Sequence, residues 1–170
     1  MNSKGHILWA DDEIEMLKPH ILYLENKGYQ VTPVSTGEDA VNFCDDQNVD
    51  LVLLDEMMTG LDGLTTLKHI KEKHSTLPVI MITKNEEEWL MEEAIAAQIT
   101  NYLTKPVNPS QILIACKNAL ESRKIQSDYI AKEYLQSFQK IAERIESAES
   151  IEDWYTITDN LSDWFIKFDN

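Results

Sequence analysis

Five short apolar runs, each followed by an amphipathic stretch, constrain the fold of this chain more than any other feature. They are Ile7–Ala10, Gln30–Val34, Leu51–Leu54, Val79–Ile82 and Asn101–Leu103. Each run is too short for a helix, and strands that alternate with helices are typical of a parallel sheet covered by helices on both faces. The third run has no polar alternation, which predicts a central strand buried on both sides. We therefore expect an α/β fold with a doubly wound, five-stranded sheet.

Residues at the predicted helix ends agree with this interpretation. The segment Ser35–Glu38 matches a capping box, in which the serine hydroxyl and the glutamate carboxylate would bind free amide groups. Asn108 is a candidate N-cap, with Pro109 at the first helical position and Gln111 at the third. Gly28 follows the first predicted helix, where a left-handed backbone commonly ends a helix.

The pattern changes near Arg123-Lys124, where the strand signals stop. Beyond it, apolar residues recur at spacings of three and four, which predicts one face of a helix. Ser147–Ser150 interrupts this stripe, and Ser150 would cap a second helix. We expect a first domain over residues 1–124 and a small all-α region, a helical bundle or linker, over residues 125–170. Whether the last helix of the first domain continues into this region stays open, and we expect the chain to be part of a longer protein.

Composition and charge exclude several classes of protein. The 15 basic and 30 acidic residues give a net charge of −15, and such a field repels phosphate backbones, so we expect no direct binding of nucleic acid. The apolar runs are too short to span a bilayer, and the N-terminus lacks the apolar stretch of a signal peptide. Cys44 and Cys116 fall on apolar stripes of predicted helices, which indicates buried, reduced thiols. We expect a cytoplasmic protein that does not engage a membrane.

Four of the predicted strands are followed by side chains that can carry chemistry. They are Asp11 and Asp12 after the first strand, Asp55 after the third, Thr83 after the fourth and Lys105 after the fifth. Ligands of doubly wound sheets bind at the carboxyl ends of the strands, so these five side chains should converge on one pocket. Any one of these side chains is common in loops, whereas four strand ends that carry them in this order indicate a functional site.

Three carboxylates in one pocket would repel one another unless a cation bound between them. Oxygen ligands of this kind suit Mg²⁺, which keeps several waters and binds phosphate oxygens. We expect Asp12 and Asp55 to bind the ion directly and Asp11 to bind it through water. The backbone carbonyl of Met57 would complete the protein ligands.

The same pocket could transfer a phosphoryl group. Asp55 stands alone at the end of the central strand and is the candidate nucleophile. Lys105 would pair with the phosphate as a point charge, and the Thr83 hydroxyl would donate a hydrogen bond to it. An alternative is a Mg²⁺-dependent phosphohydrolase with an Asp nucleophile. Such enzymes commonly place a second Asp two residues later as general acid, where this chain has Met57.

Several motifs in the first 124 residues match one known family. They are Asp11-Asp12, Val49–Asp55, Gly60–Gly63, Thr83, Tyr102 and Lys105-Pro106. With them, residues 1 to about 124 resemble the receiver domain of bacterial two-component response regulators. The resemblance implies a flavodoxin-like strand order, 2-1-3-4-5, and a phosphoryl group accepted by Asp55 from a sensor histidine kinase. It also implies a switch pair, in which Thr83 moves toward the phosphate and Tyr102 turns inward.

By this resemblance the chain is not an enzyme, apart from its own phosphorylation and dephosphorylation. The complete acidic set argues against a pseudo-receiver that acts only as a scaffold. Receivers commonly pair through their fourth helix, fifth strand and fifth helix, so we expect a phosphorylation-dependent homodimer. Acidic residues of one protomer would face basic residues of the other. The acidic residues are Glu86–Glu88, Glu92 and Glu93, and the basic ones are Lys117, Arg123 and Lys124.

A narrower resemblance covers the whole chain. It is carried by Asp12–Ile14, Leu17–Leu22, Leu24–Tyr29, Ile82–Lys84, Glu86–Glu88 and Lys105–Pro109. These segments resemble PorX-type regulators, which control type IX secretion. In that family the receiver is followed by a helical bundle and then by a phosphatase-like metallohydrolase domain with zinc. The resemblance therefore implies a metallohydrolase domain downstream of this chain.

Two positions depart from the general receiver pattern. Thr59 stands where many receivers have Pro, which we expect to loosen the loop after Asp55. Lys84 follows Thr83, where most receivers have a small residue. A long cation there could screen the phosphate from water, crowd the kinase or simply lie along the surface.

Overall fold

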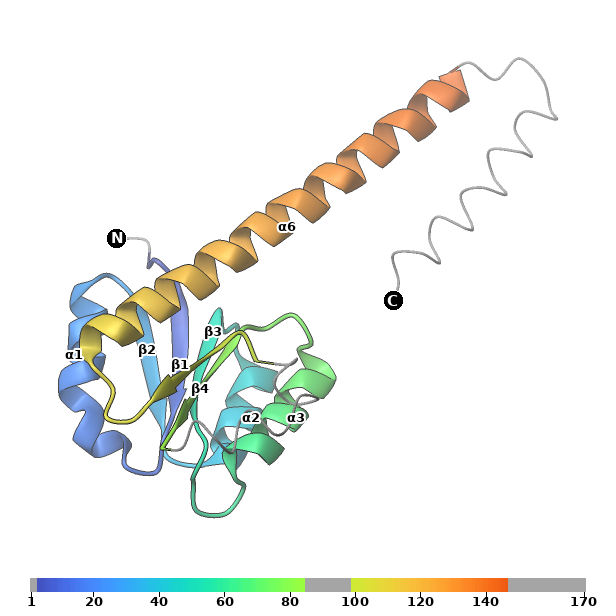
Figure 1. The fold of residues 1–170 in the computed structure, drawn as a ribbon. Helices are drawn as coiled ribbons and strands as arrows, with labels where there is room; N and C mark the ends of the chain where they lie inside the picture. The colour runs from blue at the N-terminus through green and yellow to red at the C-terminus, as the bar shows by residue number, and fades with distance from the viewer. Residues whose placement is uncertain (1–2, 85–98, 147–170) are drawn as a thin grey trace. The chain divides into compact units, whose positions relative to one another are not determined.

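A five-stranded parallel sheet forms the centre of the computed structural model, which describes residues 3–84 and 99–146 (Figure 1). The strands lie in the order β2-β1-β3-β4-β5, and every neighbouring pair is parallel. Both the α/β fold and the strand order are therefore confirmed. The strands are β1 (His6–Ala10), β2 (Gln30–Val34), β3 (Leu51–Asp55), β4 (Val79–Thr83) and β5 (Asn101–Thr104).

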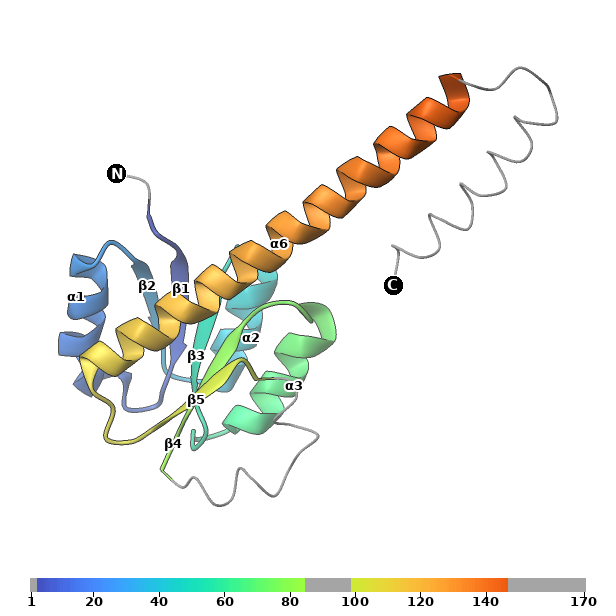
Figure 2. The ribbon, with the colours of Figure 1, turned by 45° about the horizontal axis from the view of Figure 1, so that its top comes forward.

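Helices cover both faces of this sheet, as Figure 2 shows from a second direction. α1 and the first turns of α6 pack on one face, and α2 and α3 pack on the other. The described helices are η1 (Ile14–Leu17), a 3₁₀ turn, with α1 (Lys18–Asn26), α2 (Gly37–Asp46), α3 (Gly63–Lys73) and α6 (Pro109–Glu146).

Each face of the sheet has its own apolar core. Successive side chains of a strand point to opposite faces, so β1 places Ile7 and Trp9 in one core and Leu8 and Ala10 in the other. The four apolar residues of β3, Leu51–Leu54, are completely buried. This agrees with the prediction of a central strand, and burial of each such side chain stabilises the fold by about 1.5–3 kcal/mol.

The helix caps agree with the sequence at two places and differ at one. Gly28 has a φ of 95°, the left-handed backbone expected after α1. At the start of α6, the Ser110 N–H donates to Asn108 Oδ1 (2.8 Å) and the Asn108 N–H donates to Gln111 Oε1 (3.3 Å), which confirms the predicted cap. The predicted capping box at Ser35–Glu38 is wrong by one residue.

Thr36, not Ser35, is the N-cap of α2. Its hydroxyl accepts a hydrogen bond from the Asp39 N–H (3.1 Å), and its own backbone is extended. The helix therefore begins at Gly37. A Cβ atom at this glycine would lie 2.7 Å from the Leu61 carbonyl oxygen, so close packing against the loop before α3 requires glycine here.

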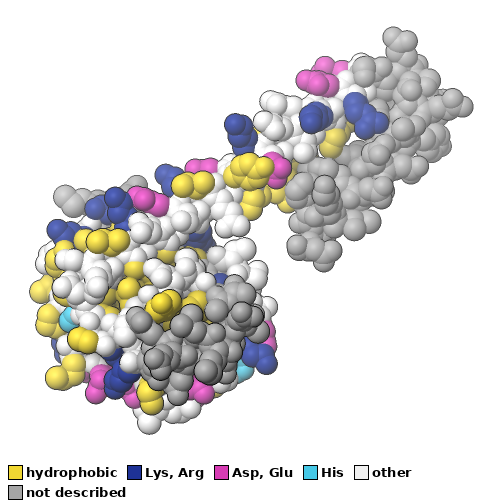
Figure 3. All heavy atoms as spheres, in the orientation of Figure 1, with side chains coloured by type: hydrophobic (Ala, Val, Ile, Leu, Met, Phe, Trp, Pro, Cys, Tyr) yellow, Lys and Arg dark blue, Asp and Glu magenta, His cyan; other side chains and the backbone are white. Residues whose placement is uncertain are grey.

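The chain divides into two units, Met1–Arg123 and Lys124–Asn170. This division lies one residue before the predicted domain boundary, and the nature of the second region stays a prediction. α6 runs without a break from Pro109 to Glu146, which answers the question of helix continuity. Apolar side chains are exposed along its later turns, among them Ile125, Tyr129 and Leu135 (Figure 3). The second helix predicted after Ser150 lies outside the described residues.

Within residues 3–84 and 99–146, no helix is both long enough and apolar enough to cross a lipid bilayer.

Both cysteines should be inert toward thiol reagents in the native protein. Cys44 and Cys116 are free and buried, and burial raises the pKa of Cys44 to about 11 and that of Cys116 to about 12. Because the thiolate is the reactive form, we expect native protein at pH 8 to react with a disulfide reagent about 100-fold more slowly than urea-unfolded protein. Release of the coloured thiol measures both rates. A native cysteine that reacts at the unfolded rate would contradict the buried placement.

Candidate functional site

The register of the sheet brings four strand ends to one edge. Ala10 of β1 lies opposite Leu54 of β3, and Asp55 at the end of β3 lies opposite Ile82 of β4. Thr83 at the end of β4 lies opposite Thr104 at the end of β5. Side chains at or directly after these strands therefore share one edge of the sheet.

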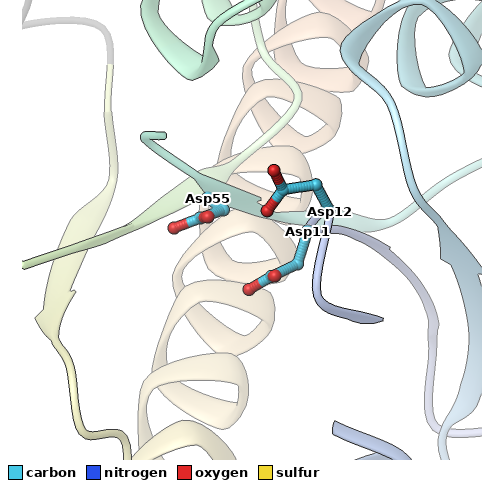
Figure 4. Close-up of side chains that lie close together, drawn as sticks. All are labelled: Asp11, Asp12 and Asp55. Carbon is cyan, nitrogen blue, oxygen red and sulfur yellow. The ribbon is translucent and has the colours of Figure 1, made fainter. Parts of the chain in front are cut away.

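Asp11, Asp12 and Asp55 form an acidic cluster at this edge (Figure 4). One carboxylate oxygen of each residue lies within 4.8 Å of the others. Asp11 and Asp55 are buried, whereas Asp12 is exposed, so the cluster is accessible from the Asp12 side. Asp11 is also held by the backbone, since its Oδ1 accepts a hydrogen bond from the Glu13 N–H (2.8 Å).

Lys105 bridges the two buried members of the cluster. Its Nζ lies 3.0 Å from Asp11 Oδ2 and 2.9 Å from Asp55 Oδ1. The side chain is only 17% exposed, so both ion pairs are largely shielded from water. Its backbone N–H donates to the Thr83 carbonyl oxygen (2.7 Å), which fixes the loop after β5 against the end of β4.

These contacts shift the pKa values of the buried groups. Burial raises the pKa of Asp55 above its usual range; the hydrogen bond from Lys105 opposes the rise, and the charges of Asp11 and Asp12 add to it. Burial alone would lower the pKa of Lys105, but its bonds to Asp55 and Asp11 outweigh that effect and raise the pKa. Three carboxylates and one ammonium leave two negative charges when all are ionised. A divalent cation with a preference for oxygen would balance them.

Thr83 lies next to the cluster but contacts a residue that the sequence did not single out. Its side chain is 1% exposed, and its hydroxyl donates a hydrogen bond to Glu56 Oε2. Glu56 directly follows Asp55, yet nothing in the sequence pattern predicts that its carboxylate reaches across to the end of β4.

Thr59 ties the loop after β3 to the cluster, contrary to the expectation that it loosens this loop. Its backbone N–H (3.3 Å) and its hydroxyl (3.0 Å) both donate to Asp12 Oδ2. A proline at this position has no N–H and no hydroxyl, so it could make neither bond. Thr59 therefore helps to orient the one exposed carboxylate of the site.

The remaining predicted residues surround this edge. Tyr102 on β5 is 41% exposed, and the side chain of Met57 is also largely exposed. Lys84 lies on the surface directly after β4. The role of the Met57 carbonyl as a metal ligand and the role of Tyr102 in switching stay predictions.

A cavity of about 240 Å³ lies elsewhere, between the segments that precede β3 and β4. Its basic lining residues already have acidic partners. His74 Nε2 lies 3.2 Å from Asp45 Oδ1, Lys73 also binds Asp45, and Arg123 lies 3.4 Å from Asp50 Oδ1. Since this cavity is at the amino ends of the strands, it is not part of the acidic site.

Comparison with known proteins agrees with this geometry. The family model of the response regulator receiver domain matches residues 7–117. The chain belongs to the response regulator receiver family. Apart from His6, the match includes all five strands, and it extends into the first turns of α6.

Curated relatives are regulators of several kinds. The transcriptional regulatory protein ResD of Bacillus subtilis is 35% identical over 123 residues, which are 72% of this chain and 50% of ResD. The regulatory protein VanR of Enterococcus faecium is 35% identical over 118 residues, 69% of this chain and 51% of VanR. The cyclic di-GMP phosphodiesterase response regulator RpfG of Xanthomonas campestris is 31% identical over 113 residues, 65% of this chain and 30% of RpfG. This receiver chain thus spans about half the length of these relatives, or less.

Solved structures show the same fold. A response regulator receiver domain protein from Clostridium thermocellum is 28% identical with a TM-score of 0.65, and the match covers 72% of this chain and 98% of that one. NtrX from Brucella abortus is 27% identical with a TM-score of 0.68, over 75% of this chain and 29% of NtrX.

Proposed function

We propose that this receiver accepts a phosphoryl group on Asp55 from a sensor histidine kinase and thereby changes its self-association or its output. The observation that carries the proposal is the buried Asp55 carboxylate, which lies beside Asp11 and Asp12 and is paired with Lys105. Membership of the receiver family supports the histidine kinase as partner and the cytoplasm as location. The known relatives differ in output, so the output of this chain is a separate proposal.

The acidic cluster fits a Mg²⁺ ion. Asp12 and Asp55 would bind it directly, Asp11 would bind it through water, and the Met57 carbonyl would complete the protein ligands. When bound, the ion neutralises charge on the incoming phosphoryl group. Thr59 would keep Asp12 oriented, since both of its hydrogen bonds go to a single carboxylate oxygen.

The transfer itself needs little more than a positioned carboxylate. An Asp55 oxygen attacks the phosphorus of the kinase phosphohistidine, a P–O bond forms, and the P–N bond breaks. The electron pair of the broken bond stays on the histidine nitrogen. Lys105 already lies 2.9 Å from Asp55 Oδ1, and it would pair with the transferred phosphoryl group. Thr83 would then donate its hydroxyl to a phosphoryl oxygen, and Tyr102 would turn inward.

A small phosphodonor with Mg²⁺ tests the proposal by intact-mass spectrometry. A receiver should gain one phosphoryl group and keep it through the measurement. A Mg²⁺-dependent phosphohydrolase would release phosphate without a lasting adduct, and a scaffold without catalytic chemistry would do neither. Either of these two results would exclude the switch.

The narrower resemblance supports a PorX-type output in type IX secretion. No described contact bears on this output, so it rests on the sequence motifs alone. In the source organism, Asp55→Ala should reduce the amount of type IX cargo in the culture medium. Unchanged cargo would exclude this output and leave the phosphorylation chemistry in place.

Phosphorylation should also promote a homodimer through β5, α6 and the acidic segment at residues 86–93, which lies outside the described residues. The Nζ of Lys117 lies 3.7 Å from Glu121 Oε1 on the same helix. Because the Lys117 side chain is exposed, its ammonium is accessible to a partner protomer. Arg123 was expected in the same contact, but its guanidinium donates to the Asp50 carbonyl oxygen (2.8 Å). The dimer proposal therefore relies on Lys117 and Lys124.

Light scattering with a beryllofluoride phosphate mimic measures this association. We expect the mimic to strengthen the dimer about tenfold, which is about 1.4 kcal/mol. Lys117→Glu should remove most of this effect, whereas Lys68→Glu, the same charge reversal on the exposed side of α3, should not. If both variants behave like the wild type, the interface lies elsewhere.

A further inference from the structure

Glu56 and Thr83 are held against each other by their backbones. The Glu56 N–H donates to the Ile82 carbonyl oxygen (2.9 Å), and the Glu56 carbonyl oxygen accepts from the Gly63 N–H (2.9 Å). Thr83 is the last residue of β4, and its carbonyl oxygen accepts from the Lys105 N–H. Gly63 also packs closely, because a Cβ atom there would lie 2.7 Å from the Glu56 Cα. The side-chain contact between Glu56 and Thr83 therefore joins two residues whose backbones are held in place by hydrogen bonds.

The Glu56 carboxylate binds Thr83 and does not belong to the acidic cluster. Among the described residues, the group of carboxylates that could share a metal ion consists of Asp11, Asp12 and Asp55. Glu56 Oε2 instead accepts the hydrogen bond of the buried Thr83 hydroxyl. Hydrogen bonds to an ionised acceptor are about twice as strong as neutral ones.

We propose that Glu56 is a positioning residue that holds the Thr83 hydroxyl in the unphosphorylated state and so opposes activation. This inference rests on the proposed roles of Asp55 and Thr83. A hydroxyl has one hydrogen to donate, so Thr83 must leave Glu56 before it can donate to a phosphoryl oxygen on Asp55. The contact exists only in the unphosphorylated state and therefore shifts the equilibrium toward that state.

Binding of beryllofluoride in the presence of Mg²⁺, followed by fluorine NMR, measures this bias. Glu56→Ala removes the acceptor, and we expect it to tighten binding of the mimic about tenfold, or about 1.4 kcal/mol. Glu38→Ala is the matched control, because it removes one exposed carboxylate that lies beside Gly60, in the loop after β3. Glu56→Gln keeps an oxygen acceptor without the charge, so it should tighten binding of the mimic less than Glu56→Ala does, by about threefold.

A double-mutant cycle separates the contact from simple charge repulsion. If Glu56 acts through Thr83, Glu56→Ala should change binding by less than about twofold in a Thr83→Ala background. Glu56→Ala should change the affinity for Mg²⁺ alone no more than Glu38→Ala does, since Glu56 is not in the acidic cluster.

Three results would count against this role of Glu56. Equal binding by Glu56→Ala and Glu38→Ala would show that the contact does not bias the switch. A tightening that persists in the Thr83→Ala background would show that Glu56 acts by its charge. If the wild type itself does not bind the mimic while it binds Mg²⁺, the proposed function fails, and this inference fails with it.

Discussion

Asp55→Ala should abolish phosphoryl labelling by a small phosphodonor while the protein stays folded. The substitution removes the only carboxylate that we assign as nucleophile. It should not destabilise the fold, because Lys105 keeps its second partner, Asp11 Oδ2, at 3.0 Å. Burial and the neighbouring carboxylates raise the pKa of Asp55, so its loss relieves an unfavourable buried charge. Without metal, the melting temperature should equal or exceed that of the wild type.

The control for this experiment is Asp46→Ala, which removes an exposed carboxylate of α2. It should label like the wild type. Intact mass gives the extent of labelling, and circular dichroism gives the melting temperature. Labelling that survives in Asp55→Ala would move the nucleophile to another residue of the acidic cluster.

Lys105→Ala should have the largest effect on stability without metal. It leaves Asp11 and Asp55 buried and without their shared counter-ion, and loss of one partner of a buried ion pair costs about 3 kcal/mol. The cost is greatest where Asp55 is ionised and falls as the pH drops enough to protonate it, and the raised pKa of Asp55 moves that fall to higher pH. Urea unfolding at neutral pH, with and without Mg²⁺, measures it, and Mg²⁺ should restore most of the loss.

The same variant should also change metal binding. Because the Lys105 ammonium bridges two of the proposed metal ligands, its removal should strengthen Mg²⁺ binding. It should weaken the response to phosphorylation, since Lys105 would no longer pair with the phosphoryl group. Lys73→Ala is the control, since its ion pair with Asp45 lies on the surface, where such pairs contribute little to stability. Equal stability and Mg²⁺ affinity in the two variants would contradict this role of Lys105.

Local spacing in the sequence was sufficient to predict which strands and helices form. Apolar runs of four or five residues predict strands, and a run without polar alternation predicts the central one. The order of the strands came from the family resemblance, and the structure confirms it. The position of Asp11, Asp12, Asp55 and Lys105 after successive strands was also readable, because parallel strands end at a common edge.

The cap of α2 shows where local spacing was not sufficient. Ser35 and Thr36 are both good capping residues, so the sequence did not distinguish them. The choice depends on Gly37, which packs against the loop before α3 at a distance that no side chain would allow. That constraint comes from a different part of the chain.

By itself, the sequence determined which elements form and which side chains stand at the strand ends, since both follow from periodicity along the chain. Only the tertiary structure decided which of these side chains bond to one another. Lys105 reaches Asp11 across 94 positions, Thr59 reaches Asp12 across 47, and Glu56 reaches Thr83 across 27. Such contacts depend on the register of the sheet and the path of each loop. Neither leaves a periodic signal, because a hydrogen bond across the site requires only one suitable atom at the right place.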